Sequence, residues 1–285
     1  MKKKFLAIVT AALIGTTAFA ATASAASGAI DVISREDGSG TRGAFVELFG
    51  MEEKVNGKKV DLTTDSAEIT NSTSVMMASV AGNRNAIGYI SLGSLNDSVK
   101  ALAIDGVKPS ADAIKDGGYK ISRPFNLALS SSAGNAAQDF LAFILSREGQ
   151  AVVEKAGYIG VGQPKAYAGS RPAGKIVVAG SSSVTPAMEK LKEAYLKINP
   201  GATIEIQLSD STTGMNAARD GICDIGMASR ELKESELKAG LKPVVMAMDG
   251  IAVIVNKANP VNGLSSEQIR NVFTGSAVDW SALSM

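Results

Sequence analysis

Histidine is absent from this 285-residue chain, and cysteine and tryptophan each occur once. Without histidine, Ser-His-Asp catalysis, Cys-His catalysis and histidine-ligated metal sites are excluded. The single cysteine, Cys223, can form neither an internal disulfide nor a thiolate metal cluster, and we expect it to be buried and inert. These absences weigh against most enzyme classes, so we expect no catalytic residues, no metal and no cofactor.

A charge excess of either sign is also missing. The chain has 29 Lys and Arg against 28 Asp and Glu, a net charge of +1. Residues 1–25 contain three lysines and no acidic residue, which leaves 26 against 28, or −2, for the remainder. A nearly neutral chain lacks the basic surface that nucleic acids require, so we expect no nucleic-acid partner. With 45% hydrophobic residues, the composition is typical of a globular protein of one or two domains.

Residues 1–25 have the pattern of a secretory signal peptide. A basic segment (Met1–Lys4) precedes an apolar one (Phe5–Ala20), and Ala23–Ala25 offers small residues for cleavage after Ala25. A retained membrane anchor is the alternative, but the apolar run is short and ends in Ala, Ser and Thr. We therefore expect an extracytoplasmic protein, in the periplasm, at the cell surface or secreted. No cysteine lies near this site, so we expect no lipid anchor there.

Short β-branched runs alternate with helical patterns, which predicts an α/β architecture with mainly parallel strands. The expected strands are Ile30–Ser34, Ala86–Ile90, Lys175–Ala179, Thr203–Leu208, Asp224–Met227 and Ile251–Asn256. The expected helices are Gly43–Gly50, Ala67–Val80 with Ser66 as N-cap, Gly134–Ala156, Pro186–Ile198, Asn216–Asp220 and Ser265–Phe273. In the third of these, one apolar stripe contains Phe140, Phe143, Ile144, Ala151 and Val152. The Gly- and Pro-rich stretch from Gly157 to Gly174 predicts a linker.

The segment 34–43 follows an expected strand and leads into an expected helix. Gly38 and Gly40 let the backbone approach a ligand closely, and a helix N-terminus attracts anions. Ser39 and Thr41 add hydroxyl donors, while the planar guanidinium of Arg35 fits a tetrahedral oxyanion. Nearby Asp37 could hold that guanidinium or accept a proton from the ligand. An ordinary Gly/Ser turn with a surface ion pair is the alternative.

Two further strand-to-helix loops, residues 180–186 and 208–215, are rich in hydroxyl groups. Serines placed before a helix also serve as N-caps, which is the alternative to ligand binding. Ligands of open α/β sheets bind outside the carboxyl ends of the strands. We therefore expect the three loops to converge around one small oxyanion.

At these loops the sequence resembles the phosphate-binding proteins of bacterial ABC phosphate importers, the PstS type. The matching stretches are SREDGSGTR (34–42), GSSSVTP (180–186), DIGMASREL (224–232), DGIAVIVN (249–256), VFTGSAVDW (272–280) and the segment 123–160. The resemblance implies a two-lobed periplasmic-binding-protein type II fold, each lobe a mainly parallel sheet flanked by helices. It implies a non-enzymatic receptor that captures inorganic phosphate between its lobes and delivers it to an ABC permease.

The resemblance also implies which residues bind phosphate. They are Arg35, Ser39, Gly40 and Thr41 on one lobe, and Ser182, Ser183, Val184 (through its N–H), Ser211 and Arg230 on the other. At the position of Arg230 many relatives carry an Asp that accepts a ligand proton. Here Asp37 and Asp249 are the candidates for that role.

The matching stretches stand in a rotated order, because GSSSVTP comes first in the family. We interpret this order as a circular permutation whose new ends, near Ala29 and Met285, lie close together and whose former ends are joined near residues 164–174. A piece of a tandem array is the alternative. Lobe B then comprises residues 26–122 and 258–285, and lobe A residues 123–257. The chain would cross between lobes near Ser122–Leu127 and Val253–Lys257.

Two other functions stay open on the sequence. A phosphate sensor or surface-adhesion module would keep this fold without a transport role. A secreted hydrolase that releases phosphate would need an activated nucleophile, for which the sequence offers no candidate. We expect a monomer, with a dimer that swaps halves as the alternative.

Overall fold

The computed structural model describes residues 27–283, and the expected signal peptide lies outside them. The strands are β1 (Asp31–Arg35), β2 (Glu52–Val55), β3 (Lys58–Asp61), β4 (Glu68–Thr70), β5 (Ala86–Ser91), β6 (Val99–Ala101), β7 (Ala103–Ile104), β8 (Ser122–Leu129), β9 (Gly174–Ser181), β10 (Ala202–Ser209), β11 (Ile225–Ala228), β12 (Val244–Asn256) and β13 (Gly263–Leu264). The helices are α1 (Gly40–Leu48), α2 (Thr73–Gly82), α3 (Ala111–Lys115), α4 (Asn135–Ile144), α5 (Arg147–Lys155), α6 (Thr185–Ile198), α7 (Ser211–Arg219), α8 (Glu234–Lys238) and α9 (Ser266–Phe273), with short 3₁₀ turns η1 (Leu92–Ser94) and η2 (Trp280–Leu283). Within residues 27–283, no helix has both the length and the apolar character to cross a membrane.

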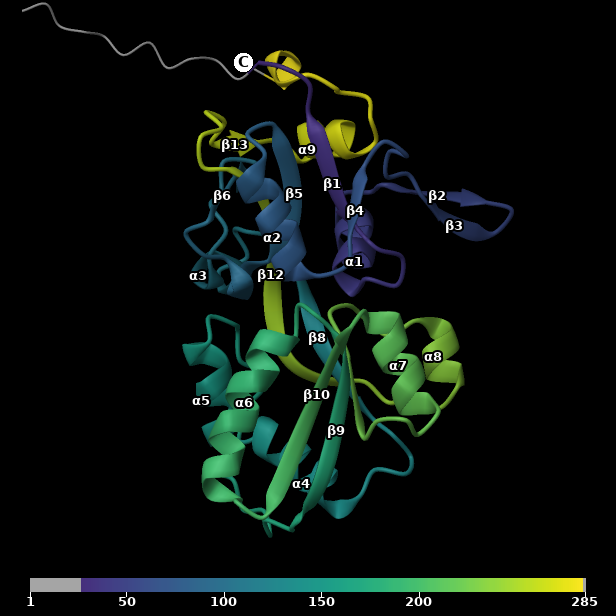
Figure 1. The fold of residues 1–285 in the computed structure, drawn as a ribbon, viewed down its shortest axis with the longest axis vertical. Helices are drawn as coiled ribbons and strands as arrows, with labels where there is room; N and C mark the ends of the chain where they lie inside the picture. Colours follow the sequence, from purple (N-terminus) through teal and green to yellow (C-terminus); the bar gives the residue numbers. More distant parts are fainter. Residues whose placement is uncertain (1–26, 284–285) are drawn as a thin grey trace, which may run out of the picture.

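One mixed sheet runs through two lobes, drawn above and below each other in Figure 1. Its strand order is β10-β9-β11-β8-β12-β5-β1-β4, which confirms the α/β fold. On either side of the central pair β8 and β12, the strands are parallel to one another. The strands β8 and β12 are antiparallel to each other, β8 is also antiparallel to β11, and β12 is also antiparallel to β5. The sheet as a whole is mixed, because β8 carries the chain from one lobe to the other and β12 carries it back. Away from these two crossing strands, β9, β10 and β11 of one lobe and β1, β4 and β5 of the other are parallel, as expected.

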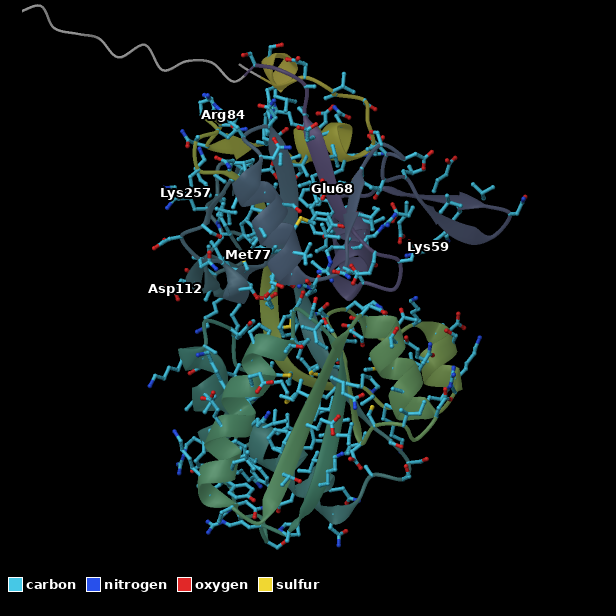
Figure 2. The ribbon with its side chains drawn as sticks, in the orientation of Figure 1. Lys59, Glu68, Met77, Arg84, Asp112 and Lys257 are labelled. Carbon is cyan, nitrogen blue, oxygen red and sulfur yellow. The ribbon has the colours of Figure 1, made fainter. Side chains whose placement is uncertain are left out.

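The strands β8 and β12 form the hinge between the lobes. The first half of β12 pairs with β8, whereas its second half, from Ile251, pairs with β5. Ile251, Val253 and Val255 belong to the same buried cluster as Phe45 and Trp280 of the upper lobe. Lys257 also lies in the upper lobe (Figure 2). We propose that lobe A passes into lobe B near Gly250, earlier than the expected boundary at residue 257.

The helix α2 starts later than the sequence predicts. Residues Glu68–Thr70 form the edge strand β4, and Ser72, not Ser66, caps the helix by accepting a hydrogen bond from Val75 N (3.3 Å). The parallel pairing of β4 with β1 satisfies backbone groups that a longer helix would have used internally. This shift places Thr73 at a helix N-terminus.

The expected helix 134–156 is interrupted at Ser146. This residue caps α5 by accepting a hydrogen bond from Gly149 N (3.2 Å), and a Cβ on Gly149 would lie 2.1 Å from Phe143 O. The break changes which residues face the core. Phe140, Phe143 and Ile144 are buried as predicted, but Val153 is buried in place of Ala151 and Val152.

The two ends of the described chain lie side by side in lobe B (Figure 1). Ile30 N donates to Val278 O (2.8 Å), and Trp280 N donates to Gly28 O (3.0 Å). The Trp280 ring packs into the core of this lobe beside Phe273. The expected closeness of the two ends is therefore observed as far as the described residues reach.

The segment 157–174 runs along lobe A and is held there by Asp139. The carboxylate of Asp139 accepts hydrogen bonds from Tyr167 Oη, Tyr195 Oη and Ser170 N. Burial opposes ionisation of Asp139, but these hydrogen bonds outweigh it and hold the pKa of this carboxyl below its usual value. The ionised carboxylate thus fixes the linker on lobe A.

This arrangement predicts a loss of stability in acid. A carboxyl whose pKa is lowered by folding stabilises the protein above its unfolded-state pKa, and the contribution is lost as the pH falls through the folded-state pKa. The midpoint of thermal unfolding should therefore fall more steeply in the unmodified protein than in Asp139→Asn once the pH drops below about 4, close to the usual Asp value of 3.8. The control is Asp112→Asn, at an exposed position of helix α3 (Figure 2), which should follow the unmodified protein. Parallel curves for all three proteins would contradict this role of Asp139.

Candidate anion-binding site

The first anion loop joins β1 to α1 in lobe B. Ser39 caps the helix, and its Oγ accepts a hydrogen bond from Arg42 N (3.3 Å). Gly38 has a φ of +87°, a conformation that favours glycine. The helix begins at Gly40, so the N–H groups of Gly40 and Thr41 belong to the first turn and have no partner within the helix. The loop thus has the donor geometry that the sequence predicts.

Lobe A contributes loops after β9, β10 and β11. The first, residues 182–184, leads into α6, and the second leads into α7 at Ser211, with Asp210 as its N-cap. Ser229 and Arg230 follow β11. The expected residues Ser182, Ser183, Val184 and Ser211 are all less than 5% exposed.

The loops of the two lobes meet. Thr41 Oγ1 lies 2.8 Å from Ser183 Oγ, and Arg35 Nη2 donates to Ser182 Oγ (3.0 Å). In Figure 2, side chains fill the space between the ribbons of the two lobes. Segments more than 140 residues apart in the chain are therefore in direct contact around one buried polar cluster.

The hydroxyl groups of this cluster are arranged to donate. An N–H group can only donate, so a hydroxyl oxygen that contacts one must accept and keeps its proton for another acceptor. Ser182 Oγ accepts from Arg35 Nη2 and from Thr73 N (3.3 Å), and Ser211 Oγ accepts from Ser229 N (3.1 Å). The protons that these hydroxyls retain favour an anion over a cation.

Arg35 is the cation at the start of the first loop, at the end of β1. Its side chain is 2% exposed, and its Nε and Nη2 each donate to the carboxylate of Glu36 at 2.8 Å. Its Nη1 is buried and has no hydrogen-bond partner within residues 27–283. A buried guanidinium nitrogen is normally satisfied, so this atom has a donor available for a further acceptor.

Tyr89 contacts the end of β1 at Ser34 and Arg35. Its Oη lies 2.8 Å from Ser34 Oγ and accepts a hydrogen bond from Arg35 N (3.3 Å). Burial raises the pKa of Tyr89 to about 12, against smaller opposing effects of these hydrogen bonds. The phenol therefore stays neutral, and it fixes the backbone at Arg35 without adding charge to the site.

The comparisons with known proteins identify the family. A model of the PBP superfamily domain matches residues 12–148 and 165–284. The phosphate-binding protein PstS 2 of Streptococcus agalactiae is 56% identical over 263 residues, covering 92% of this chain and 90% of its own length. This chain belongs to the PstS family of the PBP superfamily. PstS 2 of Streptococcus pneumoniae is 46% identical, covering 97% of this chain and 98% of its own length.

A solved structure gives the same result for the fold of this PstS-family chain. The crystal structure of a phosphate ABC transporter, phosphate-binding protein from Streptococcus pneumoniae matches with a TM-score of 0.70 and 47% identity. It covers 90% of this chain and 100% of the other. Because the alignments to the streptococcal relatives span nearly their whole length, these relatives share the order of segments seen here. They do not test the permutation relative to other PstS proteins, which stays a prediction.

Arg230 lies beside the cluster but is engaged elsewhere. Its Nη1 and Nη2 donate to the two carboxylate oxygens of Glu236 at 2.9 and 2.8 Å, and Nη2 also donates to Thr212 Oγ1 (3.1 Å). Thr212 in turn donates through N and Oγ1 to Gly38 O of the other lobe, both at 3.2 Å. A Cβ on Gly40 would lie 3.1 Å from Arg230 Cγ, so Arg230 lies next to the cluster while its guanidinium donates to Glu236 and Thr212.

Other expected residues also differ in detail. The N–H of Val184 donates to Ser181 O (3.1 Å), so it is already used within its own loop. Asp37 is fully exposed and pairs with Arg42 Nη1 at 3.3 Å, which takes it away from the cluster. Asp249 is buried but pairs with Arg123. Cys223 is buried as predicted, and burial raises the pKa of its thiol to about 11.

Sequence reasoning missed Thr73, Arg123 and Ser229. Thr73 Oγ1 lies 3.2 Å from Ser183 Oγ, Arg123 Nη2 donates to Thr41 Oγ1 (3.2 Å), and Ser229 Oγ lies 3.3 Å from the same Thr41 oxygen. A strand-to-helix junction at residues 70–73 could have identified Thr73, had the helix not been started at Ala67. Arg123 lies within a strand and carries no local signal.

No cluster of three or more metal-ligating side chains occurs within the described residues.

Proposed function

We propose that this protein is an extracytoplasmic solute-binding protein that captures inorganic phosphate between its lobes and delivers it to an ABC permease. The observation that carries the proposal is the buried cluster in which Arg35 and hydroxyls of both lobes meet. Its relatives are named for phosphate binding. Binding to both lobes at once explains how a ligand would hold them closed.

The hydrogen-bond donors of the cluster are sufficient for micromolar phosphate binding. A hydrogen bond to a charged group contributes about 1.5–3 kcal/mol, and several such bonds exceed the cost of association by enough for micromolar or tighter binding. The cluster has an unpartnered guanidinium nitrogen and hydroxyls whose protons are free to donate. The relatives are named as phosphate-binding proteins, which supports a receptor without enzymatic activity.

Calorimetric titration of the purified protein tests this function. We expect one phosphate bound per chain, with sulfate titrated in parallel to measure selectivity. Incubation with a chromogenic phosphoester should give no turnover. Absence of heat with phosphate would refute the proposal, and turnover of the ester would favour the hydrolase. Binding without stimulation of a reconstituted permease would favour a sensor or adhesion module.

We also propose that the protein is a circularly permuted monomer. The ends of the described chain are hydrogen-bonded to each other in lobe B, while the segment 157–174 connects α5 to β9 in lobe A. Both halves of the hinge, β8 and β12, come from one chain, so no exchange of halves is needed to complete either lobe. Light scattering at several protein concentrations tests the oligomeric state.

A further inference from the structure

Arg123 lies where the two crossing strands join the lobes. It stands directly opposite Asp249 in the antiparallel register of β8 and β12. The two side chains are 2% and 1% exposed, and Arg123 Nη1 lies 3.0 Å from Asp249 Oδ2. This contact is an ion pair without hydrogen-bond alignment, since Oδ2 has no hydrogen-bond partner among the described residues. Removing one member would leave the other charge buried and uncompensated, so the pair acts as a unit.

The remaining donors of Arg123 reach both lobes. Its Nε donates to Ser229 O (2.8 Å) in lobe A, and its Nη2 donates to Thr41 Oγ1 (3.2 Å) in lobe B. Its Nη1 donates to Gly250 O (3.2 Å) on β12. One side chain therefore contacts the hinge and the anion loops of both lobes at once.

The hydrogen bond from Arg123 to Thr41 determines whether the Thr41 hydroxyl donates or accepts. A guanidinium only donates, so Thr41 Oγ1 accepts from Arg123 and its own proton is directed to another acceptor. The neighbouring oxygens Ser183 Oγ (2.8 Å) and Ser229 Oγ (3.3 Å) are within reach of that proton, as an anion in the cluster would be. Arg123 thus makes Thr41 a donor.

The charges around Arg123 also favour an anion. Burial lowers the pKa of Arg123, and the positive charge of Arg35 lowers it further, whereas Asp249 raises it. Asp249, Arg35 and the phenol of Tyr158 are the charged or titratable groups that act on this guanidinium. Two buried guanidinium groups that repel each other are stabilised by a negative charge between them.

We propose that Arg123, held in place by Asp249, is a positioning residue for phosphate: it fixes the hydroxyl of Thr41 as a donor and ties that donor to the hinge. This inference rests on the proposed function, and it assigns a role to a residue that lies in none of the anion loops. It predicts that Arg123 and Thr41 contribute to phosphate affinity through each other.

A thermodynamic cycle tests this coupling. The double variant Arg123→Met/Asp249→Asn removes both charges of the pair, which folded proteins often tolerate. Thr41→Val removes the hydroxyl and keeps the shape of the side chain. Calorimetric dissociation constants for phosphate are measured for the unmodified protein, for each variant and for their combination. The control Lys175→Met/Glu205→Gln removes an exposed ion pair of lobe A.

We expect the double variant to bind phosphate at least about tenfold more weakly, with the control unchanged. Thr41→Val should raise the phosphate dissociation constant about tenfold in the unmodified protein. In the double variant it should raise this constant less than about threefold, because the Thr41 hydroxyl is no longer oriented there. A purely structural role would give independent effects that multiply. Unchanged binding by the double variant, or multiplying effects, would overturn the role of Arg123.

If the double variant does not fold, Arg123→Lys decides the question. It keeps a positive charge opposite Asp249 but lacks the planar fork that reaches Thr41, so it should behave like the double variant in the cycle. Tight binding by Arg123→Lys, with the full effect of Thr41→Val retained, would overturn the inference. Failure of the unmodified protein to bind phosphate would instead refute the proposed function.

Discussion

Gly40→Ala should weaken phosphate binding by at least about a hundredfold. A Cβ on Gly40 would lie 2.3 Å from Ser211 Oγ and 2.7 Å from Ser229 Oγ, both in the opposite lobe. Contacts this short are not tolerated, so either the two serine hydroxyls would have to turn away from the cluster or the lobes would have to stay further apart. Losing two hydrogen bonds to a charged ligand, at about 1.5–3 kcal/mol each, corresponds to at least that factor.

Gly43→Ala is the matched control, because Gly43 lies in the same helix. Neither glycine has a positive φ, so alanine strains the backbone at neither position. A Cβ on Gly43 would lie 3.8 Å from Arg230 Cδ, which is an ordinary contact. Both variants should keep or raise the midpoint of thermal unfolding, since alanine favours helix over glycine. Equal phosphate affinity of the two variants, measured by calorimetry, would show that the lobes do not close at Gly40.

Replacement of Arg35 should have a comparable effect. Arg35→Met removes the unpartnered Nη1 and also leaves Glu36 without its cation beside the cluster. Arg35→Met/Glu36→Gln removes this uncompensated charge and isolates the loss of the guanidinium. We expect at least about a thirtyfold increase in the phosphate dissociation constant for the double variant, from lost charge-assisted hydrogen bonds of about 1.5–3 kcal/mol each.

Arg219 and Asp220 provide the control for this experiment. Arg219 Nε and Nη2 donate to the neighbouring carboxylate of Asp220 at 2.7 and 2.9 Å, the same arrangement as in Arg35 and Glu36. Both residues are exposed, so Arg219→Met/Asp220→Asn should leave phosphate affinity within about twofold, because exposed ion pairs contribute little. If the Arg35 double variant also stayed within that range, Arg35 would have no place in the site.

Local signals predicted the strands and the loops that follow them. The strand before Arg35 and the Ser39 cap follow from β-branched residues, two glycines and a hydroxyl before a helix. Helix boundaries were less predictable, since the pairing of β4 with β1 decided where α2 begins. The break at Ser146 depends on a cap and on the close approach of Gly149 to Phe143 O.

The sequence by itself determined the α/β class, the loop chemistry and the likeness to PstS proteins, because these depend on short stretches and on residue type. Only the tertiary structure decided which donors share the cluster. The cross-strand pairing with Asp249 brings Arg123 to the cluster, whereas Glu236 accepts the hydrogen bonds of the Arg230 guanidinium. Contacts between segments more than a hundred residues apart depend on how the lobes pack across the hinge, and no local pattern encodes that packing.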